Sequence, residues 1–236
     1  MVKGPTPDDW HASRSETLRY FAFGRVVPLL LYGFLGKLVV GHLITSLRDT
    51  SYSDVFEVIA GPVRWAFYAA FCVIPIAIYL FRPLPRARSK APGARVAALV
   101  GTTMLLFVGA VDSGPMLFSP PIWVRDLVAV VLAASAAFEV YALVYLRFNF
   151  SIIPEVRRIV VGGPYRMVRH PLYASEIVVA VALVLSQPYQ VPALALVPFI
   201  ALQLTRMDFE EALLASVLPD YPAYAAQTAR LIPFVW

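Results

Sequence analysis

The chain has 236 residues, of which 59% are hydrophobic and 15% are charged. Soluble domains average about 45–50% apolar and roughly 25% charged residues, so this composition excludes a disordered chain, an ordinary soluble enzyme and a nucleic-acid-binding module. The formal net charge of +5 is first read, in so apolar a chain, as a sign of membrane topology. With a single cysteine, Cys72, neither an internal disulfide nor a cysteine-based metal cluster is possible.

Six apolar stretches predict membrane-spanning helices, because a helix needs about 20 mostly apolar residues to cross ~30 Å of hydrocarbon. In chain order they are Val26–Ile44, Val58–Phe81, Val96–Val111, Leu127–Leu146, Leu172–Ser186 and Val191–Thr205. The last two are short and are joined by Gln187–Gln190, which predicts an antiparallel helical hairpin. The polar stretch Met1–Thr17 does not resemble a cleavable signal peptide, so the first span is expected to be a retained anchor. The expected fold is all-α, a polytopic transmembrane helical bundle of about six spans.

Basic residues are distributed unevenly between the two ends of these spans, and the positive-inside rule converts this into an orientation. With the N-terminus inside, only Arg48 and Arg125 lie on the opposite face, while Lys37 and Arg64 fall within spans. Sixteen basic residues lie on the inner face, namely Lys3, Arg14, Arg19, Arg25, Arg82, Arg86, Arg88, Lys90, Arg95, Arg147, Arg157, Arg158, Arg166, Arg169, Arg206 and Arg230. We therefore expect a multi-pass integral membrane protein, in a bacterial inner membrane, with both termini cytoplasmic. The net charge then needs no nucleic-acid partner.

The stretch Asn149–Tyr173 is the densest polar segment, and it lies between the fourth and fifth spans. Within it, Gly162-Gly163-Pro164-Tyr165 predicts a sharp turn, since glycine permits unusual φ values and proline fixes φ. Arg169 and His170 follow, and Pro171 suits the first turn of a helix. A juxtamembrane loop would explain the arginines, but it explains less well a Gly-Gly-Pro turn beside a His-Pro helix start.

A second polar cluster, Arg206–Glu211, follows the sixth span. Arg206 and Glu210 are helical neighbours four residues apart, so they also suit a simple intrahelical ion pair. Tyr221 and Tyr224, further on, suit either interfacial anchors or a ligand pocket. Because the hairpin returns both clusters to one membrane face, we expect a single cytoplasmic site. Its arginines, histidine, carboxylates and tyrosines suit a zwitterionic cofactor with hydroxyls, a carboxylate and an aromatic base.

These residues form a recognisable combination. The run NFSIIPEVRRIVVGGPYRMVRHPLY, the R-x-x-x-E-E of the second cluster and a D-Y-x-x-Y…R-x-I-P tail resemble the isoprenylcysteine carboxyl methyltransferase family and the related phospholipid methyltransferases. The match covers roughly Arg147–Pro233. It divides the chain into an N-terminal transmembrane region, residues 1–125, with three spans and no family signal, and a methyltransferase core, residues 126–236.

The resemblance implies an S-adenosylmethionine-dependent methyltransferase whose cofactor binds from the cytosol and whose lipophilic substrate enters from the bilayer. Membrane lipids are the expected surroundings, and no obligate protein partner is evident. The resemblance implies that one wall of the cofactor pocket is formed by Tyr165, Val168, Arg169, His170, Pro171 and Tyr173. It implies that Arg206, Glu210 and Glu211 lie on the other side, and that Tyr221 and Tyr224 form a lid. Glu210 or Glu211 is expected to hold the ribose or amino end, and Arg169 or His170 to lie near the methionine carboxylate.

The candidate catalytic residues are Arg147, Glu176 and His170. No metal is expected, because methyl transfer from a sulfonium needs none and no cluster has metal-ligand spacing. A carboxylate acceptor needs no general base, whereas an amine or hydroxyl does, and then Glu139 joins Glu176 and His170 as candidates. In the eukaryotic prenylcysteine enzymes a histidine follows the Asn-Phe element, where this chain has isoleucines, so the resemblance does not fix a carboxylate acceptor.

Ionisable residues within the spans are candidates for function, because they are costly in a membrane. Glu139 lies centrally in the fourth span, and it either pairs with Lys37 or Arg64 inside the bundle or marks a polar path for the substrate. The aromatic stripe from Phe138 to Phe148 suits a tunnel lining less well than core or lipid contact.

Two other function classes remain open at this stage. A membrane reductase using NADPH is one, since integral sterol reductases have a similar C-terminal half, although they are considerably longer. A non-catalytic transport or pathway protein of the same fold is the other. The presence of Arg206, Glu210, Glu211 and His170 together favours an enzyme.

Overall fold

A computed structural model of the chain describes residues 18, 20–49, 51–52, 55–110, 114–186 and 188–233. Helices of various lengths dominate it, and two short strands form the sheet of the described part. The elements in chain order are η2 (Ala22–Val26), α2 (Val27–Arg48), α3 (Val55–Val58), η3 (Ile59–Val63), α4 (Arg64–Phe81), β1 (Ala87–Arg88), α5 (Pro92–Ala110), α6 (Ile122–Leu146), η4 (Arg147–Asn149), β2 (Glu155–Val156), η5 (Gly163–Arg166), α7 (Pro171–Ser186), α8 (Gln190–Val217) and α9 (Tyr221–Gln227).

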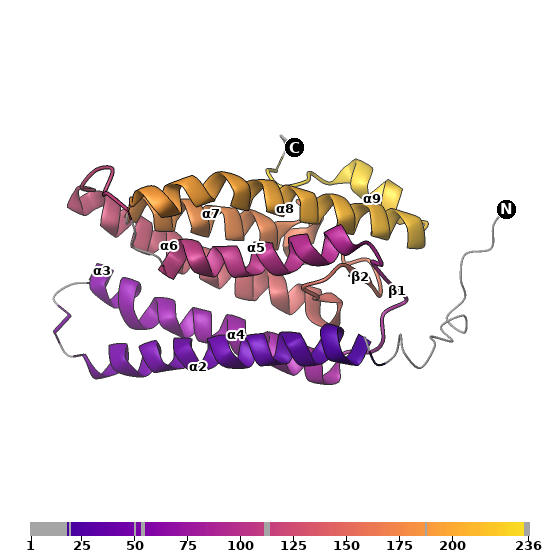
Figure 1. Ribbon diagram of the computed structural model, residues 1–236, viewed down its shortest axis with the longest axis horizontal. Helices are drawn as coiled ribbons and strands as arrows, with labels where there is room; N and C mark the ends of the chain where they lie inside the picture. Colours follow the sequence, from indigo (N-terminus) through magenta and orange to yellow (C-terminus); the bar gives the residue numbers. More distant parts are fainter. Residues whose placement is uncertain are drawn as a thin grey trace.

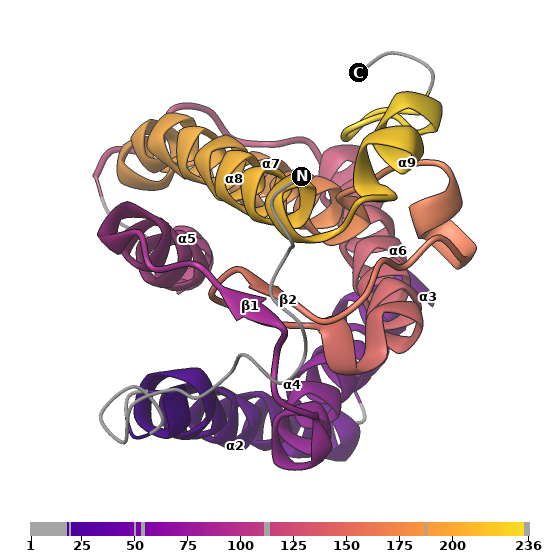
Figure 2. The same ribbon diagram turned by 90° about the vertical axis from the view of Figure 1, so that its right-hand side faces the viewer.

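The long helices run roughly side by side in two groups (Figure 1). Helix α2 packs against α4, and helices α5 to α8 form the second group, in which α6 contacts α7 and α5 contacts α8. Contacts between α4 and α6 join the two groups. Seen from the end, β1 and β2 lie between the groups (Figure 2). Val156 of β2 belongs to the same buried cluster as Tyr221 of α9. The polar loops and the C-terminal tail therefore gather at one end of the bundle.

The structure confirms an all-α helical bundle with helices at all six predicted positions. Among the described residues, four helical stretches are long and apolar enough to cross a membrane, namely Ala22–Arg48, Gly61–Phe81, Ile122–Asn149 and Gln190–Val217. Pro171–Leu185 is a shorter apolar helix. The polar stretch Met1–Thr17, which does not resemble a signal peptide, lies outside the described residues, as does Gln187 of the predicted linker.

The predicted sixth span lies within a longer helix. Helix α8 extends beyond the predicted apolar span and continues without a break to Val217, so the polar cluster Arg206–Glu211 lies inside it, as the helical spacing of Arg206 and Glu210 predicted. A helix can continue beyond the apolar segment because its backbone hydrogen bonds are satisfied within the helix. Helices α7 and α8 touch each other, yet α8 packs more extensively on α5 and α7 on α6.

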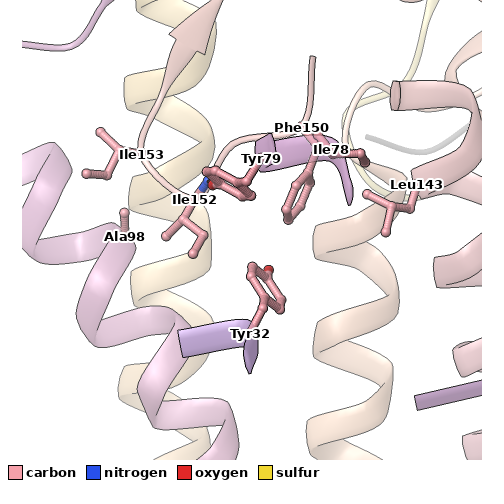
Figure 3. Packing of buried hydrophobic residues seen from close by; sticks show 8 residues of the cluster. All are labelled: Tyr32, Ile78, Tyr79, Ala98, Leu143, Phe150, Ile152 and Ile153. Carbon is pink, nitrogen blue, oxygen red and sulfur yellow. The ribbon is translucent and has the colours of Figure 1, made fainter. Parts of the chain in front are cut away.

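A buried aromatic and aliphatic cluster joins the N-terminal and C-terminal halves (Figure 3). Tyr32 of α2, Tyr79 of α4 and Phe150 have their ring centroids 6.1–6.3 Å apart. The Tyr79 hydroxyl also accepts a hydrogen bond of 2.9 Å from the backbone N–H of Ile152. This cluster holds the chain segment after α6 against the first helix pair.

A buried carboxylate organises the end of the bundle at which the strands lie. Glu155 of β2 has no exposed side-chain surface and contacts three guanidinium groups. Its Oε2 lies 2.8 Å from Nη2 of Arg157 and 3.3 Å from Nη1 of Arg82, and its Oε1 lies 3.4 Å from Nε of Arg88. Arg82 also donates to the carbonyl oxygen of Phe150 at 3.0 Å. Buried charges are tolerated when they are paired in this way.

This cluster changes the interpretation of the basic loops. Arg82, Arg88 and Arg157 count among the residues whose positive charge predicts the inner face, but they are wholly or largely buried around Glu155. Their charges hold the loops together as well as marking a side of the membrane. These contacts were not predictable from the sequence, because Arg82 and Arg88 precede α5 whereas Glu155 and Arg157 follow α6.

Replacing the central carboxylate tests this role. We expect Glu155→Gln to lower the free energy of unfolding by about 3–5 kcal/mol, because it leaves buried guanidinium groups without their countercharge. Denaturant titration of the detergent-solubilised protein measures the change. The control Asp49→Asn alters an exposed loop carboxylate and should leave stability nearly unchanged. Equal stability of Glu155→Gln and the unmodified protein would contradict the assignment.

Candidate active site

A tight turn begins the polar segment that precedes α7. Gly163 adopts a φ of +57°, which L side chains rarely adopt, and Pro164 follows in the first turn of η5. A Cβ at Gly163 would lie 2.7 Å from ring atoms of Tyr145. Glycine is therefore required here both by backbone conformation and by the close approach of α6. The turn directs Tyr165 into the protein interior, where it is buried.

The segment after this turn pairs with the C-terminal tail. Val168 and Ala229 form a parallel bridge. The N–H of Arg169 donates to the carbonyl oxygen of Ala229 at 2.8 Å, and the N–H of Ala229 donates to that of Met167 at 3.1 Å. Residues 60 positions apart in sequence are thus held side by side, and the side chains of the Arg169-His170 pair are fixed in direction.

Glu211 of α8 is the carboxylate at which three basic side chains meet. Its Oε1 accepts a hydrogen bond from Nε of Arg169 at 3.0 Å, lies 2.9 Å from Nε2 of His170 and lies 3.3 Å from Nε of Arg230. Arg169 also donates to the carbonyl oxygens of Ala225, at 2.8 Å, and Thr228. One carboxylate therefore joins the segment before α7, helix α8 and the tail.

A second polar group lies deeper between α7 and α8. The Tyr173 hydroxyl donates to Oε2 of Glu210 at 3.1 Å. The Arg206 guanidinium lies 4.9 Å from the centroid of the Tyr173 ring and 3.6 Å from Oε2 of Glu176. Gln203 completes the group, because it accepts from Arg206 at 2.7 Å and donates to Glu176.

These side chains line a cavity of about 730 Å³. Its polar part is formed by the segment before α7 and by α7 and α8, through Tyr165, Arg169, His170, Pro171, Tyr173, Glu176, Arg206 and Glu210. Its apolar part is formed mostly by α2 and α4, through residues that include Tyr32, Phe34, Leu38, Val39, Trp65, Tyr68 and Phe71. The cavity thus has a charged part and an apolar part, as binding sites for amphipathic ligands do.

The predicted site residues fall into three groups by position. Tyr165, Arg169, His170, Pro171, Tyr173, Arg206, Glu210 and the catalytic candidate Glu176 line the cavity. Val168, Glu211, Tyr221 and Tyr224 do not line it but contact or flank residues that do. Arg147 does not line the cavity either; its side chain is exposed at the end of α6, where its φ is +48°, although its backbone is next to the lining residue Leu146. The structure therefore brings together the predicted residues of both polar clusters, and it leaves Arg147 outside them.

Helices α2 and α4 contribute to the cavity in a way that the sequence did not reveal. His42 of α2 stacks on Trp65 of α4, with ring centroids 4.6 Å apart, and both residues line the cavity. Aromatic residues in a predicted span look the same in sequence whether they face lipid or a cavity. A histidine and a tryptophan within these spans were the available signal.

The proposed pairing of Glu139 with Lys37 was wrong. Glu139 is 4% exposed and lines the cavity, whereas Lys37 is exposed on α2, and no ion pair joins the two. The side chain of Arg64, the other predicted partner, lies outside the described residues. The prediction that the aromatic stripe of the fourth span does not line a tunnel is confirmed, because Phe138, Tyr141 and Tyr145 are partly exposed and do not line the cavity.

The tyrosines around the tail are held in their protonated form. Burial raises the pKa of the Tyr165 hydroxyl well above its ordinary value and raises that of Tyr224 to about 12. Tyr224 donates its proton to the carbonyl oxygen of Tyr165 at 2.7 Å. At neutral pH both phenols are therefore hydrogen-bond donors rather than anions.

Two buried polar atoms on the cavity wall have no hydrogen-bond partner among the described residues. They are the hydroxyl oxygen of Tyr165 and Nε of Arg206. Leaving such groups unpaired in the interior costs about 1–3 kcal/mol each, so they are suited to hydrogen bonds with a ligand. The carboxylate of Glu210 and the aromatic rings beside it add an acceptor and stacking surfaces.

Comparison with known proteins identifies the segment that carries most of these residues. Residues 127–216 match the model of the Isoprenylcysteine carboxyl methyltransferase (ICMT) family. The match confirms the resemblance found from the sequence motifs, and it supports a membrane methyltransferase. A comparison with curated proteins found no match. The ICMT-like segment begins within α6 and ends within α8, so it includes Arg169, His170, Glu211 and the second polar group, but not Arg230, α2 or α4.

Substitution of the two adjacent glycines separates backbone strain from side-chain bulk. We expect Gly163→Ala to cost about 1–2 kcal/mol of stability from its positive φ, with a further cost from the contact with Tyr145. Gly162→Ala has an ordinary φ of −101° and a Cβ 3.4 Å from Tyr145, so it should be tolerated. Thermal unfolding in detergent measures both. A Gly163→Ala protein as stable as Gly162→Ala would contradict the description of the turn.

Proposed function

We propose that the protein is an S-adenosylmethionine-dependent methyltransferase that acts on a lipophilic substrate. The observation that carries this proposal is the cavity itself, in which the charged residues of the ICMT-like segment lie at one end and apolar side chains of α2 and α4 at the other. A cofactor with amino acid, ribose and base parts suits the charged end. A substrate with a hydrocarbon portion suits the apolar end.

The residues present fit this cofactor. Tyr165 and Arg206 offer buried donors that lack partners in the described part of the chain, and a carboxylate or hydroxyl of the cofactor would satisfy them. Glu210 is an acceptor on the wall for a ribose hydroxyl or the amino group. We assign Arg169 and His170 to the same end of the pocket. Glu211, which holds these two side chains at 2.9–3.0 Å, is then a positioning residue rather than a contact.

The cofactor supplies an activated methyl group on a sulfonium. The protein's part is to hold the acceptor in line with that methyl and to exclude water from it, which favours the reaction by positioning and desolvation. The burial of Pro171 and His170 at the start of α7 and the aromatic wall of Tyr165 and Tyr173 serve this exclusion.

The membrane provides the second half of the proposal. Phe34 and Leu38 line the cavity and yet are 61% and 48% exposed, so the apolar end borders the outer surface of α2. In a bilayer this surface faces lipid, and a substrate would enter there without crossing water. The distribution of basic residues supports a cytoplasmic position for the charged end, where the cofactor is made available.

Titration calorimetry tests the cofactor assignment and the alternative reductase. We expect the detergent-purified protein to release or absorb heat with S-adenosylmethionine and not with NADPH. Tyr165→Phe should lower the affinity for S-adenosylmethionine by roughly threefold to tenfold without lowering the stability of the protein, because it removes a hydroxyl that has no partner among the described residues. Tyr52→Phe removes a hydroxyl away from the cavity, bonded to Ser46, and should leave affinity unchanged. Heat with NADPH alone would overturn the proposal.

A further inference from the structure

Two of the carboxylates that line the cavity are the buried Glu139 and the partly buried Glu176. Glu139 comes from α6 and Glu176 from α7, and both line the cavity. They are close enough to interact electrostatically. In an interior of low effective dielectric, neighbouring like charges are costly unless a cation or a proton offsets them.

The cations on the cavity wall are already engaged. Arg206 is paired with Glu176 at 3.6 Å. Arg169 is paired with Glu211 and donates to two backbone carbonyl oxygens. The wall carries three carboxylates, those of Glu139, Glu176 and Glu210, against these two guanidinium groups.

Glu139 is the carboxylate that lacks a cation among the described side chains. The Ser175 hydroxyl lies beside it, but that hydroxyl donates to the carbonyl oxygen of Ser135 at 3.2 Å. Glu176 differs, because both Arg206 and Gln203 hold its Oε2. A buried carboxylate that has a hydroxyl neighbour but no cation is stabilised by a cation that the ligand brings.

We propose that the methyl acceptor is a lipophilic amine that binds as an ammonium ion with its charge facing Glu139, and that Glu139 takes the proton that makes the nitrogen nucleophilic. This rests on the proposed methyl transfer and names its substrate class. A carboxylate acceptor would instead add a further negative charge beside Glu139 and Glu176, with both wall arginines already engaged. The apolar end of the cavity accommodates the hydrocarbon part of the amine.

The proton step is required by the chemistry of nitrogen. An ammonium nitrogen has no lone pair, so one N–H bond must break, with the proton forming an O–H bond on Glu139 and the electron pair remaining on nitrogen. The nitrogen then bonds to the methyl carbon as the carbon–sulfur bond breaks and sulfur keeps that pair. The products are a methylated ammonium ion, the thioether and one proton, which Glu139 releases to water. Glu139 suits this role better than Glu176, whose charge Arg206 stabilises.

The test compares two probes of equal chain length, dodecylamine and dodecanoate, on the full-length protein in detergent. Binding is followed by intrinsic tryptophan fluorescence, because Trp65 lines the cavity, with Trp65→Phe as the blank. We expect the amine to bind at least about tenfold more tightly than the carboxylate. Glu139→Gln should remove that preference by lowering the affinity for the amine and not that for the carboxylate. With labelled S-adenosylmethionine, the N-methylated amine should form only when Glu139 is present.

Asp126→Asn is the matched control, since it removes a carboxylate from the same helix at a position that does not line the cavity. It should leave both affinities unchanged. Dodecanoate that binds as tightly as the amine, or a labelled methyl ester as the product, would overturn the inference. If Glu139→Gln fails to fold, as judged by its affinity for S-adenosylmethionine, the two probes on the unmodified protein still decide. Failure of the unmodified protein to bind S-adenosylmethionine would instead contradict the proposed function itself.

Discussion

Three basic side chains from two distant parts of the chain meet at the carboxylate of Glu211. Arg169 and His170 precede α7, and Arg230 belongs to the tail, so their contacts with Glu211 of α8 fix the relative positions of three segments. The backbone bridge between Val168 and Ala229 reinforces the same junction. The charged wall of the cavity depends on it, because Arg169 and His170 line the cavity only in the direction in which Glu211 holds them.

A comparable device operates at the neighbouring strands, where Glu155 gathers Arg82, Arg88 and Arg157. Each of the two carboxylates thus joins segments that are separated by whole helices. In a bundle whose helices are apolar on most sides, packing alone does not specify how the loops at one end are arranged. Buried and half-buried ion pairs provide that specificity here.

The positions of the helices could be predicted from the sequence, because a sufficiently long run of apolar residues in a membrane forms a helix, in which every backbone polar group is hydrogen-bonded. The turn at Gly163 and the helix start at Pro171 were also predictable, since glycine and proline restrict the backbone locally. The helical spacing of Arg206 and Glu210 indicated that the helix continues past Thr205, but the end of α8 at Val217 was not predictable, because polar residues after a span do not mark where a helix ends. The partners of Glu155 and the contribution of Trp65 and His42 to the cavity depend on tertiary contacts, for which a single sequence carries no periodic signal. The ICMT-like motifs directed attention to Arg206 and Glu210, but the structure separates Glu210, on the wall, from Glu211, behind it.

The proposed methyl transfer to a lipophilic acceptor takes place in a cavity whose charged wall is held by Glu211. Incubation of the purified protein with methyl-labelled S-adenosylmethionine and a native lipid extract, followed by measurement of label in the organic phase, tests this claim most directly. We expect label transfer by the unmodified protein and a loss of at least about tenfold with Glu211→Gln, since the carboxylate that holds Arg169, His170 and Arg230 in place is removed. No transfer by the unmodified protein, or an unchanged rate with Glu211→Gln, would contradict the claim.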